Sequence, residues 1–257
     1  MESRTDITVS ARNVGLDYNR IHQQAITVLR NITFDVKRAE FVVILGPSGC
    51  GKTTLLKTIC GLISVTEGEL IVDGEPPDIA KSRHKAVMSF QDACLLRWRT
   101  VLENVRLPEE LGDQRTGNAA AMLELVGLSA FANAYPDELS GGMKQRVALA
   151  RALNCQPTIL AMDEPFGQLD EPGRATLNDE LLRAWKNTQV TVVFVTHSVP
   201  EAVYLADRII VLTQRPSTIG RVIDVPFARP RNAFLRSDPQ FFALCNTISA
   251  ILSSPAA

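Results

Sequence analysis

The segment from Gly46 to Thr53 reads GPSGCGKT and matches the phosphate-loop pattern G-x-x-x-x-G-K-[ST] without a substitution. Its glycines let the backbone turn so that successive N–H groups point inward at phosphate oxygens. Lys52 supplies a positive charge for the β- and γ-phosphates, and the Thr53 hydroxyl is a magnesium ligand. A purely structural glycine turn would not explain Lys52 and Thr53 at a helix start. The sequence therefore predicts a nucleoside triphosphate site made of Gly46, Pro47, Ser48, Gly49, Cys50, Gly51, Lys52, Thr53 and Thr54.

A pair of acidic residues, Asp163 and Glu164, ends the apolar stretch TILAMDE. The tip of a strand is where α/β sheets place catalytic groups. Because side chains alternate along a strand, one carboxylate can support magnesium while the other orients a water molecule. A solvated acidic strand end is the alternative interpretation, but the phosphate loop in the same chain favours the catalytic one.

A second anion site is indicated by LSGGM, from Leu139 to Met143, which precedes the helical pattern KQRVALARAL. Ser140 is a plausible helix cap, Gly141 and Gly142 allow close backbone approach, and a helix N-terminus carries about half a positive charge. An ordinary Ser-Gly-Gly helix start is the alternative. One nucleotide in the phosphate loop does not need both sites, so we expect this one to serve the nucleotide of another subunit.

Three further residues are candidates for nucleotide contact. His197 follows the apolar run Val190 to Thr196, and Gln91 follows Ala86 to Phe90, so both stand at strand tips. A histidine there can bond the γ-phosphate, although lone histidines are more often structural. Tyr18 can stack on adenine, and core packing is nearly as well supported for it.

Short apolar runs and helical segments must position these groups. The runs that predict a parallel sheet with crossover helices are Phe41 to Leu45, Ala86 to Phe90, Ile159 to Met162, Val190 to Thr196 and Arg208 to Thr213. Strands of a flanking antiparallel layer are expected at Ile7 to Tyr18, Asn31 to Lys37 and Glu69 to Val72. Helical patterns cover Lys52 to Cys60, Val101 to Leu111, Ala119 to Val126 and Gly142 to Leu153. After Gly220 we expect a strand from Arg221 to Pro226 and a last helix from Pro239 to Leu252.

Bulk composition limits the functional classes. The formal net charge of −1 and the lack of a long basic run argue against a dedicated nucleic-acid surface. The 5 cysteines contain no C-x-x-C pair, which predicts reduced thiols rather than disulfides or a zinc site. The N-terminus has no apolar core typical of a signal peptide, and no run approaches the ~20 apolar residues that span a bilayer.

In order, and over nearly the whole chain, these motifs resemble the ATP-binding subunit of ATP-binding cassette (ABC) transporters. The resemblance rests on the phosphate loop, Gln91, LSGGM, the acid pair, Leu169-Asp170 and His197. Longer stretches, LSGGMKQRVALARAL, DEPFGQLDE, THSVPEAVYLADRIIVL and RPSTIGRVIDVPFARPRN, are similar to the subfamily serving nitrate, sulfonate, taurine and related small-molecule importers. Gln168 departs from the family pattern, where a smaller residue is more typical.

The resemblance implies an α/β fold of the P-loop NTPase (RecA-like) type, with a parallel core sheet, an antiparallel β flank and an inserted α-helical subdomain. The expected division is a core at 1–90 and 156–220, a helical subdomain at 91–155 and an accessory strand and helix at 221–257.

It also implies an ATPase using ATP and Mg2+. Lys52 and the loop amides would hold the phosphates, Thr53, Gln91 and Asp163 would serve the magnesium ion, Glu164 would orient or deprotonate water, and His197 would sense the γ-phosphate. Ser140, Gly141 and Gly142 would close over ATP bound to a second copy.

The implied partners are that second copy, membrane-spanning permease subunits and, indirectly, an external solute-binding protein, with no nucleic acid. The implied location is peripheral, on the cytoplasmic face of the bacterial inner membrane. Two alternatives remain: a soluble ABC-type ATPase acting on nucleic acid or ribosomes, and a GTPase or small-molecule kinase with the same loop. The chain lacks the tandem cassettes or long coiled-coil insertions of the former and the N-K-x-D motif of the GTPases.

Overall fold

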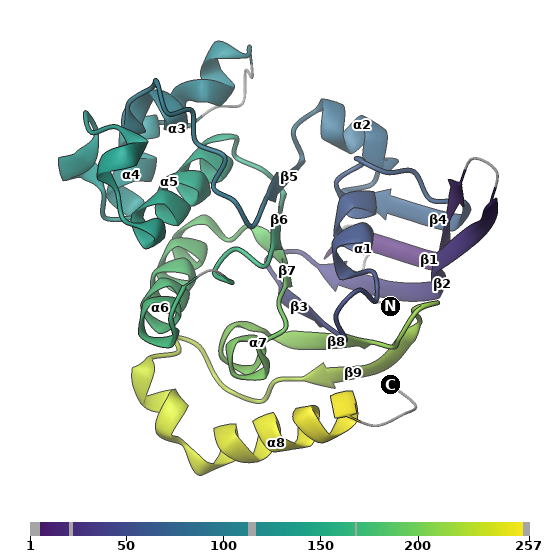
Figure 1. Cartoon of the computed structure of the whole chain (residues 1–257). Coiled ribbons are helices and arrows are strands. Elements are labelled where there is room, and N and C mark those ends of the chain that lie inside the picture. Colours follow the sequence, from purple (N-terminus) through teal and green to yellow (C-terminus); the bar gives the residue numbers. More distant parts are fainter. Residues whose placement is uncertain (1–5, 21–22, 113–116, 168, 254–257) are drawn as a thin grey trace.

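The computed structural model of the chain describes residues 6–20, 23–112, 117–167 and 169–253. Its centre is a 6-stranded sheet with the strand order β5-β6-β7-β3-β8-β9 (Figure 1). The strands are β3 (Phe41–Leu45), β5 (Ala86–Ser89), β6 (Ile159–Asp163), β7 (Thr191–Val195), β8 (Arg208–Leu212) and β9 (Ile219–Asp224). The first five pair in parallel, as the apolar runs predict, and β9 pairs antiparallel with β8.

A 3-stranded antiparallel sheet flanks this core, with the order β2-β1-β4. It consists of β1 (Ile7–Arg20), β2 (Gln23–Lys37) and β4 (Glu67–Val72). β2 begins at Gln23 rather than at the expected Asn31, because the largely apolar stretch from Ala25 to Leu29 also pairs with β1, and the pairing continues to Arg20 and Gln23. The antiparallel β flank is thus confirmed.

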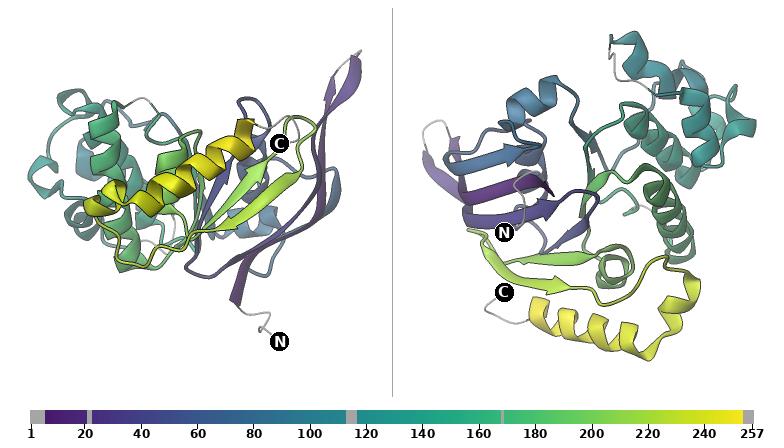
Figure 2. Two further views of the ribbon diagram at one scale, coloured as in Figure 1. Left: turned by 90° about the horizontal axis from the view of Figure 1, so that it is seen from below. Right: turned by 180° about the vertical axis from the view of Figure 1, so that it is seen from behind.

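The helical subdomain lies at the end of the molecule opposite this flank (Figures 1 and 2). Its helices are α3 (Val101–Glu110), α4 (Ala119–Leu125) and α5 (Gly141–Asn154), with two short 3-10 turns between α4 and α5. Thr100 starts α3 with a capping box that includes Glu103, and Asn118 caps α4. No strand interrupts the described residues from 91 to 155, so the expected insertion is helical.

The remaining helices connect or cover the strands of the core. They are α1 (Lys52–Ile59), α2 (Pro77–Ser82), α6 (Glu171–Thr188), α7 (Val199–Leu205) and α8 (Pro239–Ser253). The strand expected from Arg221 to Pro226 is β9, which begins at Ile219 and forms an edge of the central sheet. α8 packs against α7 on the outside of that region (Figure 2).

Side chains alternate between the two faces of β3, so the central sheet separates two hydrophobic clusters. Phe41, Val43 and Leu45 belong to a cluster shared with the helical subdomain and α6 to α8. Val42 and Ile44 belong to a second cluster, shared with α1 and the antiparallel sheet. All five β3 residues are fully buried, which explains their continuous apolar sequence. Because β6, β7 and β3 are parallel neighbours, their carboxyl ends and the loops that follow meet at one edge of the sheet.

Candidate functional site

The phosphate loop leaves the end of β3 and leads directly into α1, as the sequence predicts. Lys52 is only 6% exposed, and its Nζ donates hydrogen bonds to the carbonyl oxygens of Gly46 (3.0 Å) and Pro47 (3.1 Å). No carboxylate pairs with this ammonium group among the described residues. The loop therefore holds an uncompensated buried cation at a helix N-terminus, an arrangement suited to phosphate.

Two glycines of the loop show why side chains are excluded. Gly51 has φ 120°, and a Cβ added there would lie 2.8 Å from Cγ1 of Val28. A Cβ on Gly46 would lie 2.9 Å from Sγ of Cys50 and 3.1 Å from the carbonyl oxygen of Leu212. The loop is therefore a tight backbone cradle that only glycine can form at these positions, which fits a bound polyphosphate.

Thr53 at the start of α1 contacts Asp163 at the end of β6. The Thr53 hydroxyl donates to Oδ1 of Asp163 at 2.9 Å. Burial raises the pKa of the Asp163 carboxyl, and the hydrogen bond from Thr53 opposes that shift. A hydroxyl and a carboxylate side by side are hard oxygen donors of the kind that Mg2+ prefers.

Glu164 and His197 meet although 33 residues separate them in the chain. Nδ1 of His197 lies 3.0 Å from Oε2 of Glu164. The backbone of Glu164 has φ 45°, and its N–H donates to the carbonyl oxygen of Val195 at 2.9 Å, which ties it to β7. His197 is 59% exposed, so one face of this pair opens to solvent. A non-glycine residue in the left-handed region is characteristic of functional sites.

Gln91 lies near Glu164. A Cβ added to Gly167 would be 3.4 Å from Nε2 of Gln91 and 3.7 Å from Oε2 of Glu164, so both side chains border the same glycine. The Gln91 carbonyl accepts a hydrogen bond from Nε2 of Gln145 in α5 (2.7 Å). This bond links the edge of the sheet to the helical subdomain.

Tyr18 stands on β1 opposite Ile26 and is 40% exposed, so its ring is accessible.

The LSGGM residues are not part of this cluster. Ser140 caps α5 by accepting from the Met143 N–H at 3.3 Å. A Cβ on Gly141 would lie 3.5 Å from the Leu169 side chain, which places this turn beside the start of α6. Among the described residues, no hydrogen bond or ion pair joins 140–142 to the phosphate loop. Gln168, named above as a departure from the pattern, lies outside the described residues.

Sequence reasoning missed two residues that hold the phosphate loop. A guanidinium N–H of Arg215 donates to the Gly49 carbonyl at 2.7 Å, and the Ser217 hydroxyl donates to the Cys50 carbonyl. Both lie between β8 and β9, about 165 residues from the loop they contact. No motif spacing points to this connection.

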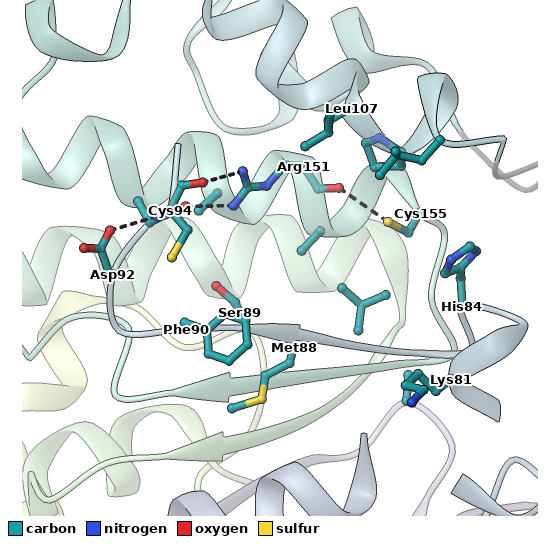
Figure 3. A pocket seen from close by; sticks show the side chains of 17 residues that line it. Lys81, His84, Met88, Ser89, Phe90, Asp92, Cys94, Leu107, Arg151 and Cys155 are labelled. Atoms are coloured by element: carbon teal, nitrogen blue, oxygen red, sulfur yellow. Dashed lines mark hydrogen bonds between the residues drawn. The ribbon is translucent and has the colours of Figure 1, made fainter. Parts of the chain in front are cut away.

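A cavity of about 490 Å3 opens between the core and the helical subdomain (Figure 3). Met88 and Phe90 line one side, Leu107 lines another, and Arg151 of α5 closes it by donating to the carbonyl oxygens of Cys94 (2.9 Å) and Ala93 (2.7 Å). The residues directly after Gln91 therefore form a wall of this cavity, while Gln91 itself lies near Glu164.

Comparison with known proteins identifies the family. The protein-family model described as ABC transporter matches residues 29–167. The chain belongs to the ABC transporter family.

Among relatives, the aliphatic sulfonates import ATP-binding protein SsuB of Bacillus thuringiensis subsp. konkukian is 41% identical, over 91% of this chain and 92% of the relative. An uncharacterized ABC transporter ATP-binding protein of Methanocaldococcus jannaschii is 46% identical, over 80% of this chain and 78% of the relative.

A solved dimeric ATP-binding cassette in a post-hydrolysis state, bound to ADP and Pi, is similar in structure. The TM-score is 0.71 at 33% identity, and the match covers 86% of this chain and all of that one. The chain is thus an ABC ATP-binding subunit with the P-loop NTPase fold, which confirms the resemblance and the fold class expected from the motifs. Membership of the ABC family implies binding and hydrolysis of ATP. Within the described residues, no helix is long and apolar enough to cross a membrane.

Proposed function

We propose that this ABC subunit hydrolyses ATP to power an importer of a small anion or organic solute, with aliphatic sulfonates, nitrate and taurine as the model substrates. The observation that carries the proposal is the convergence of Lys52, Thr53–Asp163 and Glu164–His197 at one edge of the sheet. The similarity to a sulfonate-import ATP-binding protein over most of both chains supports the transport assignment.

The proposed roles follow from the contacts. Lys52 and the N–H groups of residues 46–54 bind the phosphates, and the exposed Tyr18 ring stacks on the adenine. Thr53, Asp163 and Gln91 would hold Mg2+, which supplies positive charge against the β- and γ-phosphates.

Glu164 is the group that orients the attacking water and accepts its proton. Its backbone is fixed to Val195 and its carboxylate to the ring nitrogen of His197, so the reacting oxygen has a defined position. A carboxylate only accepts hydrogen bonds, so Nδ1 of His197 carries the proton that faces Glu164. The second ring nitrogen, Nε2, donates to the γ-phosphate in the doubly protonated form of the ring. Positioning of this kind accounts for most of the catalysis of phosphoryl transfer.

Ser140, Gly141 and Gly142 would complete the site of a second copy. They form the N-terminus of the 14-residue helix α5, and within one chain they make no contact with the phosphate loop among the described residues. A head-to-tail pair of chains would bring each LSGGM turn to the loop of the other and enclose two ATP molecules. The dimeric cassette with ADP and Pi is the structural precedent.

The remaining partners are membrane-spanning permease subunits, with an external solute-binding protein acting through them. The cavity beside Gln91 is the proposed docking place of the permease, since the segment 91–94 contacts both the catalytic edge and the cavity. The protein would then sit peripherally on the cytoplasmic face of the bacterial inner membrane. The divisions 1–90 with 156–220, 91–155 and 221–257 are proposed as core, permease-facing and accessory parts.

The test is Glu164→Gln, with Glu69→Gln as the matched control on the exposed face of β4. Glu164→Gln should keep ATP affinity within about twofold and lower turnover by ~10²-fold or more, because general-base contributions are of that size. Glu69→Gln should leave both unchanged. Retained hydrolysis in Glu164→Gln would contradict the assigned role, and co-purification with ribosomes or DNA instead of a permease would contradict the transport assignment.

A further inference from the structure

A second cavity, of about 470 Å3, lies on the side of the molecule formed by α6 and the segment after β9. From α6 it is lined by Leu182, Arg183, Trp185 and Lys186, and from the following segment by Arg229 and Arg231. None of these residues belongs to the nucleotide site or to the cavity beside Gln91. Its volume is that of a small-molecule site rather than of a packing defect.

The charges around this cavity are strongly unbalanced. Four cationic side chains line it, and the one carboxylate among the lining residues, Asp179, is already engaged by Arg236 at 2.9 Å. Arg229 pairs with Asp207 at 2.7 Å, just behind the lining. Arg183 and Lys186 are exposed, and neither makes an ion pair with any described residue. This surplus of exposed cations raises the local concentration of anions.

Arg231 places a buried positive charge behind the cavity. Its side chain is 1% exposed and donates to the carbonyl oxygens of Tyr204 (2.9 Å) and Phe227 (3.1 Å). Asp207 is 4.0 Å away, and the buried Nε has no hydrogen-bond partner within the described part of the chain. Burial, with the neighbouring Arg229, lowers the pKa of Arg231 to about 10, so the group is still charged at neutral pH. The two carbonyl oxygens and the distant Asp207 offset this charge only in part, so Arg231 adds a positive potential behind the wall of the cavity.

The other wall of the cavity is apolar and aromatic. The Arg229 guanidinium lies 4.2 Å from the centre of the Trp185 ring, and Nε1 of Trp185 donates to the Val190 carbonyl at 2.7 Å, which fixes the ring in place. Leu182 adds aliphatic surface beside it. A ligand that fills this space needs an apolar body as well as a negative group.

We propose that this cavity binds a metabolite-sized organic anion, with its carboxylate, sulfonate or phosphate group on the cationic side chains and its apolar body against Leu182 and Trp185. α6 begins shortly after Glu164, and the segment on the other side of the cavity leads to α8. The bound anion would link these two parts. The site is independent of the role proposed for ATP hydrolysis.

The probe is p-toluenesulfonate, and p-toluenesulfonamide is its neutral counterpart of the same shape. The chain has 2 tryptophans, so Trp98→Phe leaves Trp185 as the only one and makes its fluorescence a reporter of this cavity. Titrations are run with saturating ADP, which occupies the phosphate loop and removes anion binding there. Phenyl phosphate and benzoate, titrated in parallel, identify the preferred anionic group.

We expect saturable binding of p-toluenesulfonate with a dissociation constant in the millimolar range or below, and binding of the sulfonamide about tenfold weaker. Arg183→Gln with Lys186→Gln should weaken the sulfonate about tenfold without changing the urea midpoint, because both side chains are exposed and unpaired among the described residues. Arg221→Gln, an exposed arginine of β9, is the matched control and should change nothing.

Equal affinity for the charged and the neutral probe would overturn the proposal, since the cavity would then be only an apolar hollow. Unchanged affinity in the Arg183→Gln, Lys186→Gln double variant would overturn it too, as would loss of the Trp185 response when ADP is present. None of these results depends on whether the protein hydrolyses ATP.

Discussion

Two glycines of the phosphate loop provide a matched test of its geometry. Gly49 has φ 74°, and a Cβ added there meets nothing within 4 Å. Gly51 has φ 120°, and its added Cβ would lie 2.8 Å from Val28 Cγ1 and 3.2 Å from Leu29 Cδ2. Gly49→Ala therefore carries only a backbone cost, whereas Gly51→Ala carries both a backbone and a packing cost.

The expected magnitudes differ clearly. For Gly49→Ala, placing an alanine in the left-handed region costs about 1 kcal/mol. For Gly51→Ala, a strained backbone of ~1–3 kcal/mol adds to overpacking of ~1–3 kcal/mol against Val28, which is 1% exposed and stiff at χ1. At roughly 2 °C per kcal/mol for a chain of this size, the melting temperature should fall by about 2 °C for Gly49→Ala and by about 4–12 °C for Gly51→Ala.

Urea unfolding of the two variants measures these differences, and Val28→Ala separates the two terms for Gly51. If the methyl group of Val28 causes the clash, Gly51→Ala with Val28→Ala should be ~1–2 kcal/mol more stable than the sum of the single changes predicts. Additive effects in this double-mutant cycle, or equal losses for Gly49→Ala and Gly51→Ala, would refute the steric reasoning.

Three further changes test the elements around the site. Phe194→Ala should cost about 3–5 kcal/mol in urea unfolding, because this fully buried ring stacks against Phe41 and Phe166 at 6.0 Å each; a loss under about 1 kcal/mol would be inconsistent with that packing. Ser140→Ala should cost about 1 kcal/mol through the lost cap of α5, and Ser140→Asn should restore most of it. Burial raises the pKa of Glu201, against the opposing hydrogen bond from Thr196, so the folded protein keeps a proton that the unfolded chain releases. The free energy of unfolding should therefore fall as pH rises from the pKa of Glu201 in the unfolded chain to its raised pKa in the folded protein. Glu201→Gln removes this loss, so its free energy of unfolding relative to that of the original chain should increase between pH 4 and pH 7. A difference in unfolding free energy that does not change with pH would contradict this.

The sequence was sufficient to predict the central elements because they are almost completely buried. β3, β6, β7 and β8 are short, mostly apolar runs buried on both faces apart from one end residue in β6 and in β8, so their pattern depends little on distant parts of the chain. Parallel pairing then brings the residues after β3, β6 and β7 to one edge. The positions of Lys52, Asp163 and His197 at that edge follow from this rule alone.

Contacts between distant polar segments could not be predicted in the same way. Arg215 donates to the Gly49 carbonyl, and Arg229 stacks on Trp185. In each case the two residues are far apart in the sequence, and the spacing of apolar residues carries no information about such contacts. The early start of β2 was, by contrast, readable in the sequence, since Ala25 to Leu29 is a largely apolar stretch that pairs with β1; only the turn end near Arg20 and Gln23 lacks an apolar signal. The place of β9 as the edge of the central sheet likewise depends on its pairing with β8 rather than on its own composition.

The central claim is that each nucleotide site is completed by the LSGGM turn of a second copy. Sedimentation of the Glu164→Gln variant with and without ATP tests it directly, since we expect this variant to bind ATP without consuming it. ATP should convert the 28.2 kDa chain to a dimer of about 56 kDa (2 × 28.2), and adding Ser140→Arg should abolish that conversion while leaving ATP binding intact. A Glu164→Gln chain that stays monomeric with saturating ATP, or a dimer that Ser140→Arg does not affect, would contradict the account.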